Sequence, residues 1–205
     1  MSARRVAVRI AALVVVLAGC AASGHTKALR LPDAEGLTAP FLARQRVIAT
    51  AGTDRRAFEA VLQYDGHELL LLGLTPMGTK AFAVRQRGRV AEAESFVDRP
   101  LPAPPEAILL DVHWSYFLQA DTPRRDGWHR RKLDGLRLRE RWQGGRVHER
   151  IVTPPGGAPV HIAYADGLSV GRFPEGVVVT HDDVGGRTLR LEITTLTHDP
   201  IATTR

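Results

Sequence analysis

The chain has 205 residues, a formal net charge of +6 and a single cysteine, Cys20. This length supports one ordinary domain with a hydrophobic core, and one cysteine excludes a disulfide within the chain. Acidic residues are interspersed with the basic ones, without a block of like charge, which argues against a nucleic-acid-binding protein.

Residues 1–19 are typical of a secretory signal. Three arginines supply its positive region, and the apolar run at residues 10–17 is shorter than the roughly 20 residues that span a bilayer. The run ends in Leu-Ala-Gly-Cys, which resembles the lipobox of bacterial lipoproteins. The resemblance implies cleavage after Gly19, a diacylglyceryl thioether on Cys20 and N-acylation. The alternative is an ordinary signal peptide with a chance cysteine.

Residues 20–40 are small and polar and contain proline, so they are predicted to form a flexible tether. Two or more acyl chains on Cys20 are enough for stable anchoring in a membrane. Ala21 stands where an Asp would resemble an inner-membrane retention signal. We therefore expect a lipid anchor in the outer membrane, with the domain facing the periplasm.

Short strands separated by turn signals are predicted from residue 44 onward. Residues 56–64 alternate between polar and apolar, and Asp65-Gly66 indicates a two-residue hairpin turn. Residues 67–74 return from this turn. Leucines occupy both faces of the returning strand, which predicts that it is covered on both sides.

A second hairpin is predicted over residues 80–96, with Arg87-Gly88 as its two-residue turn. Its register would set large residues opposite small ones, with Val84 opposite Ala91 and Phe82 opposite Ala93. Such pairs indicate a curved sheet surface.

Residues 106–120 have the length of a helix and contain no proline or glycine. Apolar side chains cover most of the circumference of this helix, which predicts that it is buried on most sides. Pro105 suits the first turn.

Strands return in the C-terminal half. Residues 136–143 alternate between apolar and basic, and Gly144-Gly145 predicts a hairpin turn into residues 146–152. Residues 160–164 alternate, and residues 177–184 and 187–195 are predicted to form a last hairpin around Gly185-Gly186.

The Gly144-Gly145 turn would set Glu140 directly opposite Glu149 on an otherwise apolar face. Like charges in this position are unfavourable, and buried carboxylates need partners. One interpretation is that an arginine neutralises them or that this end of the sheet is wet. The other is a polar rim at a lipid cavity. The residues leave this role open.

About ten strands, one helix and no βαβ pattern predict a mainly β (α+β) domain over residues 41–198, with an antiparallel sheet and the helix packed on its inner face.

The order of these motifs resembles the LolA/LolB class of periplasmic lipoprotein carriers, over residues 44–197. The motifs are a Leu-Thr-Pro-Met-Gly turn (74–78), an acidic stretch (91–96), the helix around Trp114, a Leu-Arg-Leu-Arg-Glu-Arg-Trp strand (136–142) and two Gly-Gly hairpins. The order is still more similar to a family of predicted outer-membrane lipoproteins of unknown function, encoded beside LolA-like proteins in aryl-polyene gene clusters.

The resemblance implies a curved antiparallel half-barrel whose helix lies in the concave face and plugs an apolar cavity that takes acyl chains. The inner apolar residues would line that cavity: Phe58, Leu62, Tyr64, Phe82, Val84, Trp114, Leu138 and Trp142. The alternative is that they form an ordinary filled core. LolB has an exposed apolar loop, and the matching tip in this chain is Leu74, Pro76 and Met77.

No Gly-x-Ser-x-Gly elbow, phosphate-binding loop or metal-ligand spacing occurs in the sequence, so we expect no enzyme, no metal site and no cofactor. The favoured hypothesis is an outer-membrane lipoprotein that binds or accepts a lipid-like cargo, either lipoprotein acyl chains or an aryl-polyene lipid. Its expected partners are the membrane, this cargo and a LolA-like periplasmic carrier, and the protein is expected to be a monomer. The alternative is a structural or adaptor lipoprotein of an envelope transport complex without its own ligand.

Overall fold

The computed structural model describes residues 30–37, 39–101, 103–118, 122–169, 172–182 and 186–201. These residues form one antiparallel sheet of eleven strands in the order β5-β4-β3-β2-β1-β11-β10-β9-β8-β7-β6. The strands are β1 (Phe41–Ala51), β2 (Asp54–Tyr64), β3 (Glu68–Leu74), β4 (Lys80–Arg87), β5 (Val90–Ser95), β6 (Gly127–Leu133), β7 (Leu136–Gln143), β8 (Arg146–Thr153), β9 (Val160–Leu168), β10 (Gly176–His181) and β11 (Leu189–Pro200).

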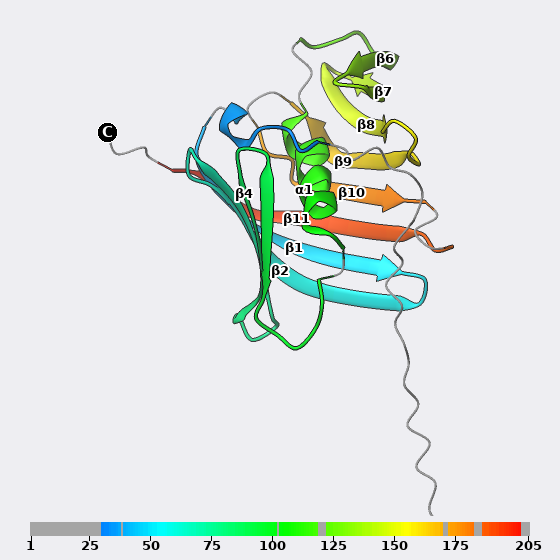
Figure 1. Ribbon diagram of the computed structural model, residues 1–205. Helices are drawn as coiled ribbons and strands as arrows, with labels where there is room; N and C mark the ends of the chain where they lie inside the picture. Colours follow the sequence, from blue (N-terminus) through cyan, green and yellow to red (C-terminus); the bar gives the residue numbers. More distant parts are fainter. Residues whose placement is uncertain are drawn as a thin grey trace, which may run out of the picture.

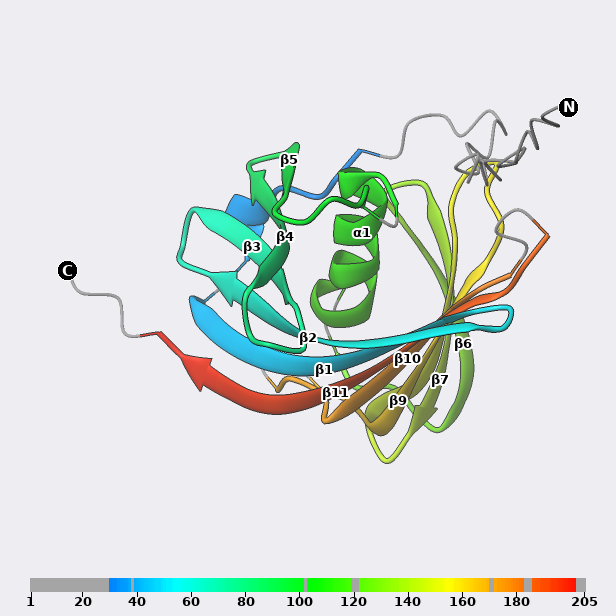
Figure 2. The same cartoon turned by 90° about the horizontal axis from the view of Figure 1, so that it is seen from below.

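The sheet consists of two wings of sequential strands. One wing is β1 to β5 and the other is β6 to β11, and the pairing of β1 with β11 joins them. The sheet curves around helix α1 (Pro105–Val112), which continues as a π-helical turn, η2 (His113–Phe117) (Figures 1 and 2). The predicted class, a curved antiparallel sheet with an apolar helix in its concave face, is confirmed.

The first turn of α1 has residues that favour a helix start, and the side that meets the sheet is apolar. Pro105 occupies the first turn, where its missing N–H costs no hydrogen bond, and Glu106 places a negative charge at the positive end of the helix. Leu109, Val112 and Trp114 are buried in one hydrophobic cluster with the inner residues of the sheet. The helix therefore covers much of the concave face.

Part of the segment predicted as a tether packs into the domain. Residues 34–36 form a 3-10 turn, η1 (Ala34–Gly36), whose first N–H donates to the carbonyl of Gly88. Leu31 and Ala34 are buried in the core cluster. The described members of this cluster lie between Leu31 and Ile193, so we expect the chain from Ala21 onward to fold by itself.

Two predicted registers are wrong by two residues. Asp65 Oδ1 accepts hydrogen bonds from the backbone of His67 and Glu68 at 2.8 Å, which makes a four-residue loop. Leu69, not His67, therefore lies opposite Tyr64. Because a shift of two residues preserves the face of every side chain, the predicted inner and outer sets still hold.

The same error occurs at the next hairpin, whose turn is Gly88-Arg89 and not Arg87-Gly88. The strand β4 pairs with β5 so that Val84 lies opposite Ala93 and Phe82 opposite Ser95. Gly88 has a φ of 54°, so its position in the turn requires the left-handed conformation.

Strand β3 is covered on one face only by the described part of the chain. Leu69 and Leu71 face the helix, whereas Leu70 and Leu72 lie on the outer face and are partly exposed. The prediction of cover on both sides is therefore wrong. The described helix lies on the concave side, so no described layer covers these two leucines on the outer face.

Strand β6 was not predicted, because Trp128, His129, Arg130, Arg131 and Lys132 show no alternation of apolar with polar residues. Its pairing with β7 makes it the edge of the sheet. The last hairpin also differs, because β10 ends at His181 and β11 begins at Leu189.

Candidate functional site

The eight predicted cavity residues all lie on the concave side, but the structure divides them into two groups. Six of them are at most 4% exposed and belong to the core cluster: Leu62, Tyr64, Val84, Trp114, Leu138 and Trp142. Phe58 and Phe82 are partly exposed. The helix thus covers most of the predicted set and leaves two aromatic rings accessible beside it.

These two rings belong to a larger apolar area, which we call the concave strip: Ala49, Phe58, Phe82, Leu191 and Ile193. The rings of Phe58 and Phe82 meet edge to face, with centroids 6.1 Å apart. Val47, which is buried, pairs with Phe58 on one side and with Ile193 on the other, which links β2 to β11. The strip is therefore continuous across three adjacent strands and reaches β4.

Gly73 shapes one end of this strip. A Cβ at this position would lie 2.2 Å from the ring of Phe82, so the ring rests directly on the backbone of β3. Any larger residue at this position would displace the Phe82 ring. Gly73 therefore determines how close the Phe82 ring lies to the sheet.

Buried hydrogen bonds tie the C-terminal half of the helical plug, which consists of α1 and η2, to the sheet. Arg150 Nη1 donates to the carbonyl of Trp114 at 2.7 Å, and the hydroxyl of Tyr164 donates to the carbonyl of Ser115 at 3.0 Å. Gln45 donates to the hydroxyl of Tyr116 at 2.9 Å. The π-helical turn thus obtains partners for carbonyls that its own hydrogen bonding leaves open.

Arg150 is a fully buried cation with a buried partner. Its Nε donates to Glu140 Oε1 at 2.9 Å, and its Nη2 lies 2.9 Å from the same oxygen. Arg131 Nε donates to Glu140 Oε2 at 3.3 Å. Two guanidinium groups therefore neutralise the buried Glu140 carboxylate, which agrees with the interpretation that an arginine satisfies it.

A β-bulge explains why Glu149 does not face Glu140. The pairing of β7 with β8 shifts by one residue between Arg141 and Trp142, which sets Arg150 opposite Glu140 and Glu149 opposite Arg141. A shift of one residue moves side chains to the other face of the sheet. Glu149 therefore lies outside, 2.6 Å from Arg141, and the predicted pair of glutamates is wrong.

Two histidines hold the helix to the sheet and have opposite pKa shifts. His113 lies 2.8 Å from Gln86, and burial lowers its pKa to about 4. His181 lies 2.9 Å from Asp111. Burial alone would lower the pKa of His181, but the hydrogen bond and negative charge of Asp111 outweigh it and raise this pKa above 6.5.

The predicted loop tip lies at the turn between β3 and β4. Met77 is 89% exposed and Pro76 is exposed, whereas Leu74 is half-buried at the end of β3. The side chains of Thr75 and Thr79 share a hydrogen bond of 2.7 Å that closes the turn. An apolar side chain therefore stands in solvent at the end of this hairpin.

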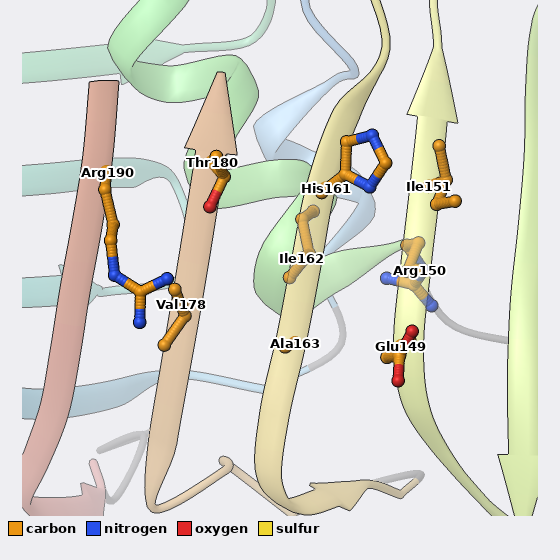
Figure 3. Close-up of a pocket in the computed structure, with 9 residues that line it drawn as sticks. All are labelled: Glu149, Arg150, Ile151, His161, Ile162, Ala163, Val178, Thr180 and Arg190. Atoms are coloured by element: carbon orange, nitrogen blue, oxygen red, sulfur yellow. The ribbon is translucent and has the colours of Figure 1, made fainter. Parts of the chain in front are cut away.

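A small hollow lies on the outer face of the sheet, across β8 to β11 (Figure 3). Its volume is about 120 Å³, and Glu149, His161, Thr180 and Arg190 make much of its lining polar. Ligand pockets for molecules of drug size begin at about 300 Å³. The hollow is therefore too small to hold an acyl chain.

Among the described residues, no three His, Cys, Asp or Glu side chains gather in a way that could hold a metal ion. Within the same residues, no helix is long and apolar enough to cross a membrane. Gly19 and Cys20 lie outside the described residues, so cleavage and lipidation there stay predictions.

The fold and the plugged concave face define a class of open, curved antiparallel sheets with one apolar helix inside. The chain belongs to a family of proteins of unknown function, DUF3261, whose model matches residues 42–197. Among curated proteins, none matches this sequence.

Two solved structures are similar to this chain, each with 10% sequence identity. One is a LolA superfamily protein, NE2245 from Nitrosomonas europaea, with a TM-score of 0.47, covering 81% of this chain and 88% of that one. The other is a putative outer membrane lipoprotein-sorting protein domain from Vibrio parahaemolyticus, with a TM-score of 0.45, covering 82% of this chain and 87% of that one. At this identity the likeness concerns the fold alone.

Proposed function

We propose that this protein is a lipoprotein of the bacterial outer membrane that binds or accepts a lipid-like cargo on its concave face. The cargo would be the acyl chains of a lipoprotein or an aryl-polyene lipid. The observation that carries the proposal is the concave strip, where apolar side chains remain partly exposed beside a helix that covers the rest of that face. Cys20 would carry the anchor, after cleavage at Gly19.

Hydrophobic transfer explains how such a surface would work without covalent chemistry. An acyl chain that leaves water for the strip gains about 25 cal/mol per Å² of apolar surface buried. The edge-to-face rings of Phe58 and Phe82 supply a broad floor, and Ile193 and Leu191 extend it across β11. Met77, at the hairpin tip, would contact the membrane or the cargo during transfer.

A second function has its own support. The buried cluster under the helix is continuous from the sheet to Leu109, Trp114 and Tyr116, as a filled core requires. A filled core favours an adaptor lipoprotein that serves an envelope transport complex and has no ligand. A LolA-like periplasmic carrier would be the natural partner for either function.

The two functions are distinguished by binding of a fluorescent fatty acid to the chain that starts at Ala21. We expect saturable binding, and we expect Phe58→Asn to weaken it by about tenfold or more, because a Phe ring contributes roughly 1.5–3 kcal/mol on burial. Leu70→Asn is the matched control, since Leu70 is also apolar and partly exposed but lies on the outer face. Unchanged binding in Phe58→Asn, or no binding by the folded wild type, would contradict the cargo function.

A further inference from the structure

The outer face of β6 and β7 carries a group of cations that strand pairing sets opposite one another. Antiparallel pairing places Arg130 opposite Arg139 and Lys132 opposite Arg137. All four side chains are exposed, on the face away from the helix. Trp128 lies on the same face, 45% exposed, with the guanidinium of Arg139 over its ring at 5.1 Å. We call these five residues the basic face.

The basic face lacks acidic partners among the described residues. The nearby Glu149 is bound to Arg141 at 2.6 Å, so this carboxylate is already neutralised. Asp126 accepts a hydrogen bond from the backbone of Gly144 at 2.8 Å, and Asp134 lies in the turn that joins β6 to β7. None of the four cations forms an ion pair with a described carboxylate.

This arrangement is unfavourable for a face that contacts only water. Like charges directly opposite each other on adjacent strands destabilise a sheet, and two such pairs occur side by side at its edge. An exposed tryptophan adds apolar surface at the same place. Both features become favourable against a surface that is negatively charged and has an amphipathic interface layer, in which Trp and Lys or Arg are enriched.

We propose that the basic face docks this domain on a membrane surface that contains anionic phospholipids, with Trp128 inserted at the level of the headgroups. Juxtamembrane cations are attracted to anionic lipid, and each contributes about fivefold to partitioning at moderate salt. Four cations on one sheet face are within the range of known lipid-binding clusters. The docking would orient the domain relative to the membrane and is independent of any cargo on the concave face.

The three tryptophans provide a direct probe, because Trp114 and Trp142 are each 4% exposed and Trp128 is 45% exposed. We would titrate the chain from Ala21 onward with vesicles of phosphatidylcholine alone and with vesicles containing about a third phosphatidylglycerol. The result expected is a blue shift of the emission and loss of acrylamide quenching with the anionic vesicles only. Both changes should disappear at high salt, because screening weakens exposed charges.

Two matched double variants distinguish the effect of the basic face on vesicle binding from the effect of the net charge. Arg130→Gln with Lys132→Gln should weaken vesicle binding about 25-fold, which is two cations at fivefold each. Arg46→Gln with Arg55→Gln removes the same charge from exposed positions on the outer face of β1 and β2 and should leave binding nearly unchanged. The four substituted side chains are exposed, so we expect both double variants to fold, and circular dichroism would confirm this.

Three results would overturn the proposal. Equal binding to neutral vesicles would remove the role of charge, and an equal loss in both double variants would show that only the net charge counts. Displacement from vesicles by an oligonucleotide that binds more tightly would assign the basic face to nucleic acid instead. Because no fatty-acid probe is used, none of these results depends on the cargo function.

Discussion

The two wings of the sheet satisfy their inner faces by different chemistry. In the wing of β1 to β5, two buried neutral side chains, Gln45 and Gln86, hydrogen-bond to the helical segment. The part of the concave strip on this wing, Ala49, Phe58 and Phe82, stays partly exposed. In the wing of β6 to β11, a buried ion pair and its hydrogen bonds fix the end of the plug. The comparison teaches that both wings hold the helix, one by neutral hydrogen bonds and the other by a buried ion pair. The concave strip stays accessible beside the helix, across the strands where the two wings meet.

The largest expected effect comes from breaking the ion pair. Arg150→Met would leave Glu140 buried without its main partner and the carbonyl of Trp114 without a donor, so we expect a loss of about 3–5 kcal/mol in the free energy of unfolding. Urea denaturation measures this loss. In the control Arg141→Met, a partly exposed pair is broken, and the loss should stay within about 1 kcal/mol.

Removing both charges sharpens the same test. Glu140→Gln combined with Arg150→Met removes both charges of the fully buried pair, so the double variant should be more stable than Arg150→Met alone. A double variant as unstable as the single one would mean that the hydrogen bonds to the plug, and not the ion pair, hold this wing.

A smaller effect separates the two faces of the other wing. Leu62→Ala should cost about 2–5 kcal/mol, because Leu62 is fully buried under the helix. Leu70→Ala should cost less than about 1 kcal/mol, because this side chain lies on the uncovered outer face. Equal losses by urea denaturation would show that another layer covers β3 and would restore the prediction made from the sequence.

The smallest effect concerns pH, and the two histidines should act in opposite directions. The pKa of His113 is lowered to about 4 in the folded protein, so the unfolded chain takes up its proton first and stability falls as the pH drops from about 6.5 toward 4. The pKa of His181 is raised, so its contribution is complete below about 6.5 and is lost as the pH rises through the folded pKa.

Unfolding in urea between pH 4.5 and 8.5 tests both signs. His113→Gln should reduce the loss of stability on the acid side relative to wild type. His181→Gln should cost more at pH 5.5 than at pH 8.5, because only the protonated ring pairs fully with Asp111. His67→Gln, at an exposed turn position, serves as the control and should follow the wild type. Shifts of the same sign in the two test variants would contradict the assignment.

The sequence was sufficient for the layers of this fold but not for its details. Glycine turns and alternation located most strands, and errors of two residues at Tyr64 and Val84 did no harm because they preserve the face. The bulge beside Trp142 shifts the register by one residue, which reverses the face of Glu149 and creates the partner of Glu140. The alternation of apolar and polar residues in the sequence does not predict such a bulge, which is recognised only from the strand pairing.

The candidate site was predictable in its residue types but not in its exposure. Alternation assigned Phe58, Leu62 and Val84 to the same inner face, and only the position of the helix decides that Phe58 alone among them stays accessible. Arg150 was missed because a charged residue in a strand is usually exposed. Its signal was present in Glu140, a carboxylate on an apolar face that needed a buried cation.

The central claim is that acyl chains bind the concave strip. The most direct measurement is photo-crosslinking of the chain from Ala21 onward with a diazirine fatty acid, followed by mass-spectrometric mapping of the labelled residues. The account predicts label on the peptides that contain Phe58, Phe82 and Leu191, competed by unlabelled fatty acid. Label that maps to the outer face around Leu70 and Leu72, or no label on the folded protein, would contradict it.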